Sequence, residues 1–243
     1  MTIPVVVSGA KGRLGARILS LCQAEEGVEV RAELTREYDG HDFAAGEVLI
    51  ETGPNGAALA HGDSAAQAGA GILMATTGFR SADEARFEAW AQKVPFLLAP
   101  NLSLGVTLML DLVRRAAGAL ADYDLEVLEI HHRKKQDAPS GTAWALAQAA
   151  AEGRGQDDLD RRAVHARAGM IGARSDEEVG MMVLRGGDVI GEHTVYLFGE
   201  TERVELTHRA ANRDAFARGA LTAARFLAQQ PPGHYTMRDV LSL

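Results

Sequence analysis

Cysteine is almost absent from this chain of 243 residues, since Cys22 is its only thiol. A single cysteine cannot form a disulfide bond within the chain, and alone it gives no zinc-binding signature. Cys22 lies among apolar residues at helical spacing, which favours a buried side chain on a helix face. We therefore expect no disulfide framework, and we predict that the protein holds no metal ion.

Positive charge is also scarce. The chain has 25 Lys and Arg residues against 33 Asp and Glu residues, so its formal net charge is −8 at pH 7. The field of such a molecule repels nucleic acids and anionic membrane surfaces. We therefore predict neither a nucleic-acid nor a membrane partner, and any basic cluster must act locally.

Long apolar segments and targeting signals are missing as well. No uninterrupted apolar run reaches the length of a membrane span. The opening residues, MTIPVVVSGAKG, lack the basic region and the long apolar region of a secretion signal. Internal repeats, low-complexity tracts and Pro/Ser-rich linkers are absent too. These features predict a cytoplasmic protein with one large domain or two smaller ones.

Short apolar runs alternate with helix-like segments over about the first hundred residues. The runs are IPVVVSG, VEVRAEL, EVLIETG, GILMATTGF and VPFLLAPN. This alternation predicts parallel strands covered by helices. In VEVRAEL, apolar and polar residues alternate, which predicts that Val28, Val30, Ala32 and Leu34 lie on one face of a strand.

The pattern changes from about Ser103 onward. A long helix is predicted over 104–123, a strand over 125–132, a helix capped by Ser140 over 140–153, and β-rich runs over 179–210. Gly186-Gly187 and Gly199 separate these β-rich runs, which is typical of antiparallel hairpins. A last helix over 213–230 is expected to pack back on the first domain, so the second domain is predicted to be an insertion.

A glycine-rich loop joins the first predicted strand to the first predicted helix. Gly9, Gly12 and Gly15 have the spacing G-x-x-G-x-x-G. Glycines there allow a tight turn and let a pyrophosphate approach the positive end of the helix. The residues 75–79 and 99–103 follow later strands, at the edge where open α/β sheets bind ligands. These positions predict a dinucleotide site.

The segment HHRKKQDAPSGTA, residues 131–143, concentrates positive charge in an acidic chain. A solvated charged face is one interpretation, but the segment lies directly between an apolar strand and a helix start. Nucleic-acid binding would need interleaved aromatic residues, and a metal site would need separated ligands with carboxylates. An anion site fits better, because a helix start offers backbone N–H groups, hydroxyls and a positive dipole end. A small dicarboxylate could be held there, with a His or Lys handling protons.

Seven motifs follow one another along nearly the whole chain. They are GAKGRLG, ATTGF, APNLSLGV, EIHHRKKQDAPSGTA, LRGGDVIGEHTV, ELTHRAANRDAFARGA and MRDVL. Together they resemble the 4-hydroxy-tetrahydrodipicolinate reductases of bacterial and plant lysine biosynthesis. The long histidine-containing motif is the most specific of them.

The resemblance implies an α/β fold with a Rossmann-like dinucleotide-binding domain, residues 1–102 and 213–243. A mixed α+β domain for substrate binding and tetramerisation, residues 103–212, would be inserted in it. The implied activity is the reduction of 4-hydroxy-tetrahydrodipicolinate to tetrahydrodipicolinate by hydride transfer from NAD(P)H, in diaminopimelate and lysine biosynthesis. Members of the family are usually cytoplasmic homotetramers. We expect the tetramer interface between about Met181 and His208, where a broad β-rich surface needs a partner.

The resemblance also assigns site residues. His131 matches the family's proton-handling histidine, and Lys135 matches its proton donor. The residues implied for the dicarboxylate substrate are His132, Lys135, Ser140, Gly141 and Thr142. Those implied for the cofactor are Gly9, Ala10, Lys11, Gly12, Arg13, Leu14, Ala75, Thr76, Thr77, Ala99, Pro100, Asn101 and Leu102. Cations around His131 are expected to keep it uncharged near neutral pH.

The chain departs from the family pattern in three places. Only about ten residues separate Arg36 from the strand at Val48, so the cofactor domain is expected to be trimmed. The usual Asp-Phe-Thr after that strand is Glu51-Thr52-Gly53. The usual acidic residue at the end of the second strand is Thr35.

The third departure bears on cofactor choice. A hydroxyl at Thr35 and cations at Arg36 and Lys11 suit a 2′-phosphate, which an acidic side chain would repel. We therefore add Thr35 and Arg36 to the cofactor site and predict that NADPH is preferred and NADH is usable. Another imine or amino-acid dehydrogenase, or a cofactor-sensing regulator without turnover, remain alternatives. The presence of both His131 and Lys135 favours an enzyme.

Overall fold

A computed structural model describes residues 2–37 and 40–243, and it divides the chain into two compact units. The first unit comprises Met1–Leu104 and Arg213–Leu243, and the second comprises Gly105–Asn212. The second unit is therefore an insertion in the first, and each is described by itself.

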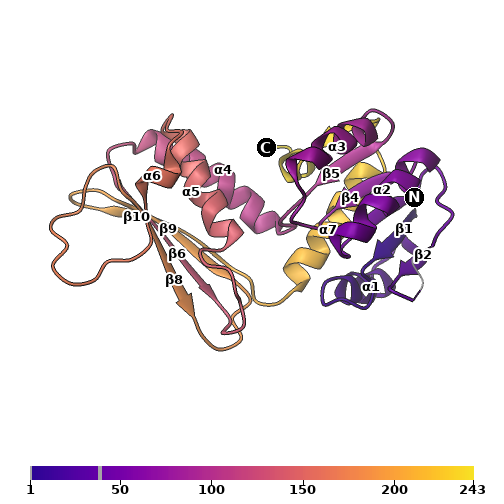
Figure 1. The fold of residues 1–243 in the computed structure, drawn as a ribbon, viewed down its shortest axis with the longest axis horizontal. Coiled ribbons are helices and arrows are strands. Elements are labelled where there is room, and N and C mark those ends of the chain that lie inside the picture. The colour runs from indigo at the N-terminus through magenta and orange to yellow at the C-terminus, as the bar shows by residue number, and fades with distance from the viewer. Residues whose placement is uncertain (1, 38–39) are drawn as a thin grey trace. The chain divides into compact units, whose positions relative to one another are not determined.

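The first unit is built on a parallel sheet of six strands (Figure 1). The strands are β1 (Ile3–Ser8), β2 (Val28–Leu34), β3 (Val48–Glu51), β4 (Gly71–Met74), β5 (Pro95–Leu98) and β11 (Gly233–Tyr235). Their order is β11-β5-β4-β3-β1-β2, and every neighbouring pair is parallel. Parallel strands need crossover connections, which explains why helical segments separate the apolar runs of the sequence. The C-terminal strand β11 extends the sheet beside β5 and has no counterpart in the sequence-based prediction.

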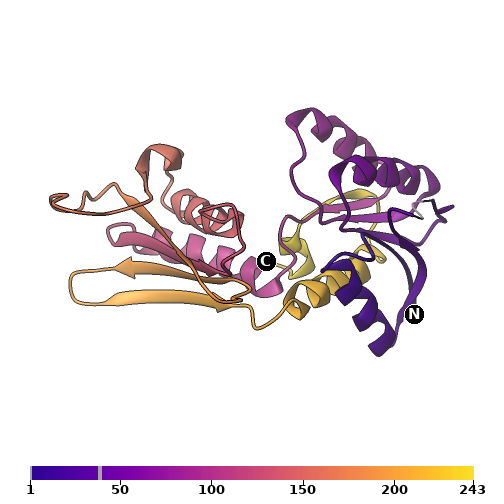
Figure 2. The ribbon, with the colours of Figure 1, turned by 60° about the horizontal axis from the view of Figure 1, so that its bottom comes forward.

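Helices cover both faces of this sheet. They are α1 (Gly15–Ala24), α2 (Asn55–Ala68), the 3-10 turn η1 (Ser81–Asp83), α3 (Glu84–Ala91), α7 (Asp214–Leu227) and α8 (Met237–Val240). Helices α1 and α7 bury their apolar side chains on one face, and α2 and α3 bury theirs on the other. Figure 2 shows α7 beside α1, so the last long helix packs back on the first unit as predicted. Cys22 is buried in α1, and burial raises the pKa of its thiol to about 11.

The prediction that four alternating residues share one face of β2 is wrong. Val5 lies opposite Val30 in the β1–β2 ladder, whereas the next residue, Val6, lies opposite Ala32. The extra residue in β2 is a bulge, and it reverses the faces of the side chains that follow it. Val30 therefore packs with the α1–α7 core, and Ala32 packs with the α2–α3 core. Of the four residues in the prediction, Val28 and Val30 thus face one side of the sheet, and Ala32 and Leu34 face the other.

The second unit contains a mixed sheet of five strands. The strands are β6 (Asp124–His131), β7 (Ala163–Val164), β8 (Val179–Arg185), β9 (Glu192–Phe198) and β10 (Arg203–Arg209). The helices are α4 (Leu104–Ala119), α5 (Gly141–Gly153) and α6 (Leu159–Arg162). Side chains of α4 and α5 share one apolar core with a single face of the sheet. The fold class predicted from the sequence, a Rossmann-like α/β domain with a mixed α+β insertion, is confirmed.

Strand β6 lies at the centre of this sheet, whose order is β10-β9-β6-β8-β7. Strands β9 and β10 form an antiparallel hairpin across Gly199, as predicted. The hairpin predicted across Gly186-Gly187 is wrong, because β8 pairs with β6 in parallel and β9 pairs with the other edge of β6. Glycines indicate a reversal of the chain, but they do not predict that the two flanking strands pair with each other. Here β6 lies between them.

Candidate active site and cofactor cleft

The glycine loop between β1 and α1 leaves no room for a side chain. Gly9 has a φ of +72°, and a Cβ atom added to it would lie 2.7 Å from Thr52 Oγ1 and 2.9 Å from the Gly53 nitrogen. The Gly12 nitrogen donates a hydrogen bond to the Gly9 carbonyl oxygen at 2.7 Å, which closes a tight turn. The loop therefore brings bare backbone to the C-terminal edge of the sheet. This is the surface that a pyrophosphate needs in order to approach the start of a helix.

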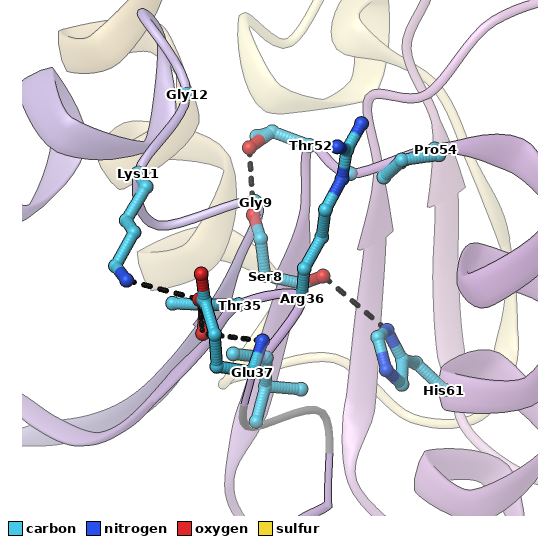
Figure 3. A pocket seen from close by; sticks show the side chains of 12 residues that line it. Ser8, Gly9, Lys11, Gly12, Thr35, Arg36, Glu37, Thr52, Pro54 and His61 are labelled. Atoms are coloured by element: carbon cyan, nitrogen blue, oxygen red, sulfur yellow. Dashed lines mark hydrogen bonds and ion pairs between the residues drawn. The ribbon is translucent and has the colours of Figure 1, made fainter.

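A cavity of about 560 Å³ opens beside this loop (Figure 3). We refer to it as the glycine-loop cavity. Five predicted cofactor residues line it, namely Gly9, Lys11, Gly12, Thr35 and Arg36. Its other lining residues are Ser8, Leu34, Glu37, Thr52, Gly53, Pro54 and His61. The structure thus brings together the ends of β1, β2 and β3 around one hollow.

Glu37 joins two of the predicted cofactor residues at one end of this cavity (Figure 3). Lys11 Nζ lies 2.9 Å from Glu37 Oε2, and Thr35 Oγ1 donates to the same oxygen at 3.0 Å. The hydrogen bonds from Lys11 and Thr35 lower the pKa of Glu37. A carboxylate therefore lies beside the hydroxyl and the cation, where the sequence predicts that Glu37 offsets part of the local charge, and it lies two residues later than the usual acidic position.

Predicted cofactor residues also line a second, smaller cavity of about 140 Å³. They are Leu14, Ala75, Ala99, Pro100, Asn101 and Leu102, and Phe216 of α7 joins them. Four predicted residues, Ala10, Arg13, Thr76 and Thr77, line neither cavity. Thr76 instead donates from its hydroxyl to the Gly53 carbonyl oxygen at 2.7 Å, so it holds the β3 loop against β4.

A buried pair of ionisable groups, of which His61 lines the glycine-loop cavity, was missed by sequence reasoning. Glu51 is fully buried, and its Oε2 lies 2.6 Å from His61 Nδ1. The other oxygen of Glu51 accepts a hydrogen bond from the Gly53 nitrogen at 2.6 Å. Ser8 Oγ lies 3.3 Å from the same His61 nitrogen. The motif Glu51-Thr52-Gly53, which departs from the family pattern, thus forms a hydrogen-bond network with Ser8 and His61, two residues that line the cavity.

The second unit places the basic segment between β6 and α5. Side chains alternate along β6, so Glu129 and His131 face the side covered by the helices. The parallel ladder places Arg185 of β8 opposite His131, and the antiparallel ladder places His193 of β9 opposite Glu129. Sheet register therefore gathers four polar side chains from three strands at one end of the sheet.

Glu129 is the centre of this group, although its side chain is fully buried. Its two oxygens accept hydrogen bonds from both terminal nitrogens of Arg185, at 2.8 and 2.9 Å, and from the Ser140 nitrogen at 3.0 Å. His131 Nδ1 also bonds to Glu129. Burial alone would raise the pKa of Glu129, but the hydrogen bonds from Arg185 and His131 outweigh it and lower that pKa. Sequence reasoning missed Glu129, although its spacing from His131 in the strand could have indicated a shared face.

Burial lowers the pKa of His131, and the charges of Lys135 and Arg185 lower it further. The hydrogen bond and charge of Glu129 act in the opposite direction without reversing the result. The lowered pKa agrees in direction with the expectation that His131 is uncharged near neutral pH. The sequence attributed this to neighbouring cations, whereas burial is the largest cause. Burial also lowers the pKa of the neighbouring His193 to about 4, with a smaller effect from His131.

Helix α5 begins where the sequence predicted, with Ser140 as its N-cap. Ser140 Oγ accepts a hydrogen bond from the Ala143 nitrogen at 3.1 Å and lies 3.1 Å from His193 Nε2. The sequence predicts that backbone N–H groups at this helix start bind a ligand. The N–H group of Ser140 is not available for this, because it donates to Glu129. Gly141 is exposed, and Thr142 is half-buried at the first turn.

The loop between β6 and α5 carries the predicted proton donor. Lys135 is mostly buried, with 20% of its side chain exposed, and its Nζ lies 2.8 Å from both carboxylate oxygens of Asp137. The hydrogen bond from Lys135 lowers the pKa of Asp137. The neighbouring Arg133 and Lys134 are exposed. One cation of the basic segment is thus turned inward while two others remain in solvent.

Family comparison accounts for both units. The family description "Dihydrodipicolinate reductase, N-terminus" matches residues 3–102, and "Dihydrodipicolinate reductase, C-terminus" matches residues 105–241. The chain belongs to the dihydrodipicolinate reductase family. The identification made from the seven motifs is thereby confirmed, as is the expectation of an NAD(P)H-dependent oxidoreductase of lysine and diaminopimelate biosynthesis.

Relatives of this reductase align over its whole length. A 4-hydroxy-tetrahydrodipicolinate reductase from Anaeromyxobacter sp. (strain Fw109-5) is 42% identical, with 99% of this chain and 98% of the relative covered. The protein of the same name from Methanopyrus kandleri is 41% identical, with 98% and 96% covered. The solved dihydrodipicolinate reductase from Paenisporosarcina sp. TG-14 superposes with a TM-score of 0.77 at 24% identity, covering 97% of this chain and 98% of that one. At that identity the likeness shows the fold alone.

The described residues carry neither a membrane-spanning helix nor a candidate metal site. No helix within 2–37 and 40–243 is long and apolar enough to cross a membrane. The same part of the chain contains no group of three or more His, Cys, Asp or Glu side chains placed to hold a metal ion.

Proposed function

We propose that this reductase converts 4-hydroxy-tetrahydrodipicolinate to tetrahydrodipicolinate, with His131 and Lys135 handling the protons. The observation that carries the assignment is the arrangement at the end of β6. His131 is held by a buried carboxylate, Lys135 is turned inward, and both stand next to the start of α5 in the chain. The substrate is a small dicarboxylate, and cations beside a helix N-terminus are suited to bind it.

The residues of the first unit fit a nicotinamide dinucleotide. A Cβ atom at Gly9 would collide with the β3 loop, so only a glycine lets the backbone pass this close to that loop at the edge of the cavity. The two cavities together collect most of the predicted contacts, from Gly9 and Arg36 in one to Ala99 and Leu102 in the other. The cofactor supplies a hydride, and the protein supplies placement and charge.

In the proposed mechanism, the substrate loses water to give a conjugated imine. Hydride addition at ring C4 then gives an enamine anion, which takes up one proton to become tetrahydrodipicolinate. Lys135 donates a proton in this step, and Asp137 holds its ammonium group in place beforehand. The lowered pKa of His131 leaves it mostly uncharged at neutral pH, so it can accept and return a proton. His132 and the first turn of α5, with Gly141 and Thr142, hold the carboxylates.

The activity is tested with purified protein and substrate formed in place from pyruvate and aspartate semialdehyde. We expect loss of reduced-nicotinamide absorbance that depends on both precursors. Absence of turnover with this substrate, combined with turnover of another imine or amino acid, would assign the chain to a different dehydrogenase activity. Cofactor binding without turnover of any of these compounds would support the regulator alternative.

We propose NADPH as the preferred cofactor and Arg36 as the residue that binds its 2′-phosphate. Arg36 lines the glycine-loop cavity and is exposed, so its guanidinium can reach a ligand there. Glu37 engages Lys11 and Thr35, which limits the cation charge available and explains why NADH should remain usable.

Replacing Arg36 by alanine should lower the ratio of kcat/KM for NADPH over NADH by about tenfold or more, because a hydrogen bond to a charged group contributes about 1.5–3 kcal/mol. The preference should also weaken as salt rises, since exposed charges are screened. Arg31→Ala is the matched control, because Arg31 is an exposed arginine of the preceding strand β2 that pairs with Glu29 and does not line the cavity. A ratio that responds equally to both substitutions, or to neither, would refute the role of Arg36.

We also propose that the reductase is a homotetramer whose interface includes the strands between about Met181 and His208. Leu184 and Phe198 support this, with exposed fractions of 52% and 36% on the sheet face turned away from the core shared with α4 and α5. A large apolar side chain left exposed on a sheet favours a protein partner. Sedimentation equilibrium at micromolar concentration should give the mass of four chains, and the mass of one chain would contradict the proposal.

A further inference from the structure

We propose that Glu129 is a positioning residue that, clamped by Arg185, fixes the orientation and the tautomer of His131, so that His131 Nε2 is the atom that handles the proton. This inference rests on the role proposed above for His131. It concerns Glu129 and Arg185, which lie outside the basic segment and within two of the seven motifs, but to which the sequence assigned no function.

The clamp begins with the geometry of the Glu129–Arg185 pair. Each terminal nitrogen of Arg185 donates to a different oxygen of Glu129, at 2.8 and 2.9 Å, which is the parallel two-point arrangement that guanidinium and carboxylate favour. The Ser140 nitrogen adds a third donor at 3.0 Å. Glu129 is fully buried, so its oxygens have no water to turn toward. The carboxylate is thus held in one orientation, ready to orient whatever binds it next.

The clamped carboxylate determines which nitrogen of His131 carries hydrogen. An ionised carboxylate only accepts hydrogen bonds, and the pKa of Glu129 is lowered, so Glu129 is ionised at neutral pH. The bonded His131 Nδ1 must therefore be the N–H donor. In the uncharged ring the lone pair then resides on Nε2.

A glycine lies next to that second nitrogen. A Cβ atom added to Gly191 would lie 3.0 Å from His131 Nε2. Because residue 191 is glycine, that volume contains no side chain. The nitrogen that Glu129 leaves as the acceptor is thus also the nitrogen that a side chain at residue 191 would crowd.

The same clamp reaches the loop that carries Lys135. The Arg185 Nη2 atom, besides binding Glu129, donates to the Asp137 carbonyl oxygen at 2.7 Å. The carboxylate of Asp137 in turn bonds Lys135. One buried carboxylate therefore connects the two groups to which proton transfer is assigned, so their relative placement depends on it.

Charged and titratable groups face His131 from several elements. Glu129 lies on its own strand, Arg185 on β8, His193 on β9 with its ring centroid 5.2 Å away, and Lys135 on the following loop. Asp137 lies beyond, bonded to Lys135, and His208 of β10 pairs with His193 in the ladder. Glu129 favours the protonated imidazole, whereas Arg185 and Lys135 oppose it.

Two substitutions in the clamp should therefore move the titration of His131 in opposite directions. Glu129→Gln removes the anion and should shift the His131-controlled limb of the pH profile of kcat/KM to lower pH, by about one unit or more. Arg185→Gln removes a cation and should shift the same limb to higher pH. A merely structural role would damage activity or folding in both variants, but it would not produce shifts of opposite sign.

Glu126→Gln is the matched control for this pair. Glu126 lies on the same strand and is also bound at two points by an arginine, Arg167, but it faces away from His131. We expect this variant to keep the wild-type position of the limb. Equal shifts in Glu126→Gln and Glu129→Gln, or shifts of the same sign in Glu129→Gln and Arg185→Gln, would overturn the proposal.

A His131→Gln variant separates this inference from the proposed function. If the limb persists in His131→Gln, the role proposed for His131 itself is wrong. If the limb disappears there but stays in place in Glu129→Gln, only the positioning role is wrong. Should either clamp variant fail to fold, the imidazole nitrogen resonances of the wild-type protein decide the matter. Hydrogen on Nδ1 supports the proposal, and hydrogen on Nε2 in the uncharged ring refutes it.

Discussion

Replacing Lys135 by alanine should lower kcat by about 10²–10⁴-fold, which is the usual contribution of a positioned proton donor. The ammonium group is mostly buried and bonded to Asp137, so its loss removes a donor that solvent does not readily replace. Dinucleotide binding should be unchanged, because the glycine-loop cavity belongs to the other unit of the chain. The measurements are steady-state kcat and the dissociation constant of NADPH.

Lys134→Ala is the control for this result. Lys134 is adjacent in sequence and has the same charge, but it is exposed. A field effect of the basic segment as a whole would lower kcat in both variants to a similar extent. Unchanged kcat in Lys135→Ala would show that the proton comes from another group.

Replacing Gly9 by alanine should weaken dinucleotide binding at least tenfold. The φ of +72° at this position strains any residue with a Cβ atom, at a cost of about 1–3 kcal/mol. The added carbon would also lie 2.8 Å from the Thr52 carbonyl carbon and 2.9 Å from the Gly53 nitrogen, both of which are backbone atoms. The loop would have to move away from β3, which changes the surface that the pyrophosphate meets. Calorimetric titration with NADPH measures the loss.

Gly46→Ala separates backbone strain from steric collision. Gly46 also has a positive φ, of +86°, but nothing lies within 4 Å of an added Cβ atom. This variant should lose stability without losing affinity for the dinucleotide. Equal affinity in wild type and in Gly9→Ala would mean that the cofactor does not lie against this loop.

Local patterns in the sequence were sufficient where the deciding interactions are short-range. The glycine spacing at Gly9 to Gly15 and the N-cap at Ser140 depend on a few consecutive residues, and the structure has both as predicted. The alternation of apolar runs with helices predicted the parallel sheet for the same reason, because each element carries its own period. The long histidine motif was specific enough to identify the family.

What the sequence did not reveal depends on which strands become neighbours. Gly186-Gly187 indicates a reversal, but only the pairing of β8 and β9 with opposite edges of β6 places Arg185 opposite His131. The bulge in β2 is similar, since alternating burial persists while the two halves of the strand face different cores. Both features arise from long-range hydrogen bonding, which no local period encodes.

The residues of the candidate sites differ in the same way, since some follow from local sequence patterns and others only from long-range contacts. The sequence by itself determined the family, the two-unit α/β fold and the candidate proton carriers His131 and Lys135, because these follow from motifs and local periods. Only the tertiary structure decided that Glu129 bonds His131, that Glu51 pairs with His61 and that Glu37 engages Lys11. Two of these carboxylates are buried, and a buried carboxylate is stable only with partners, which the fold brings from distant parts of the chain.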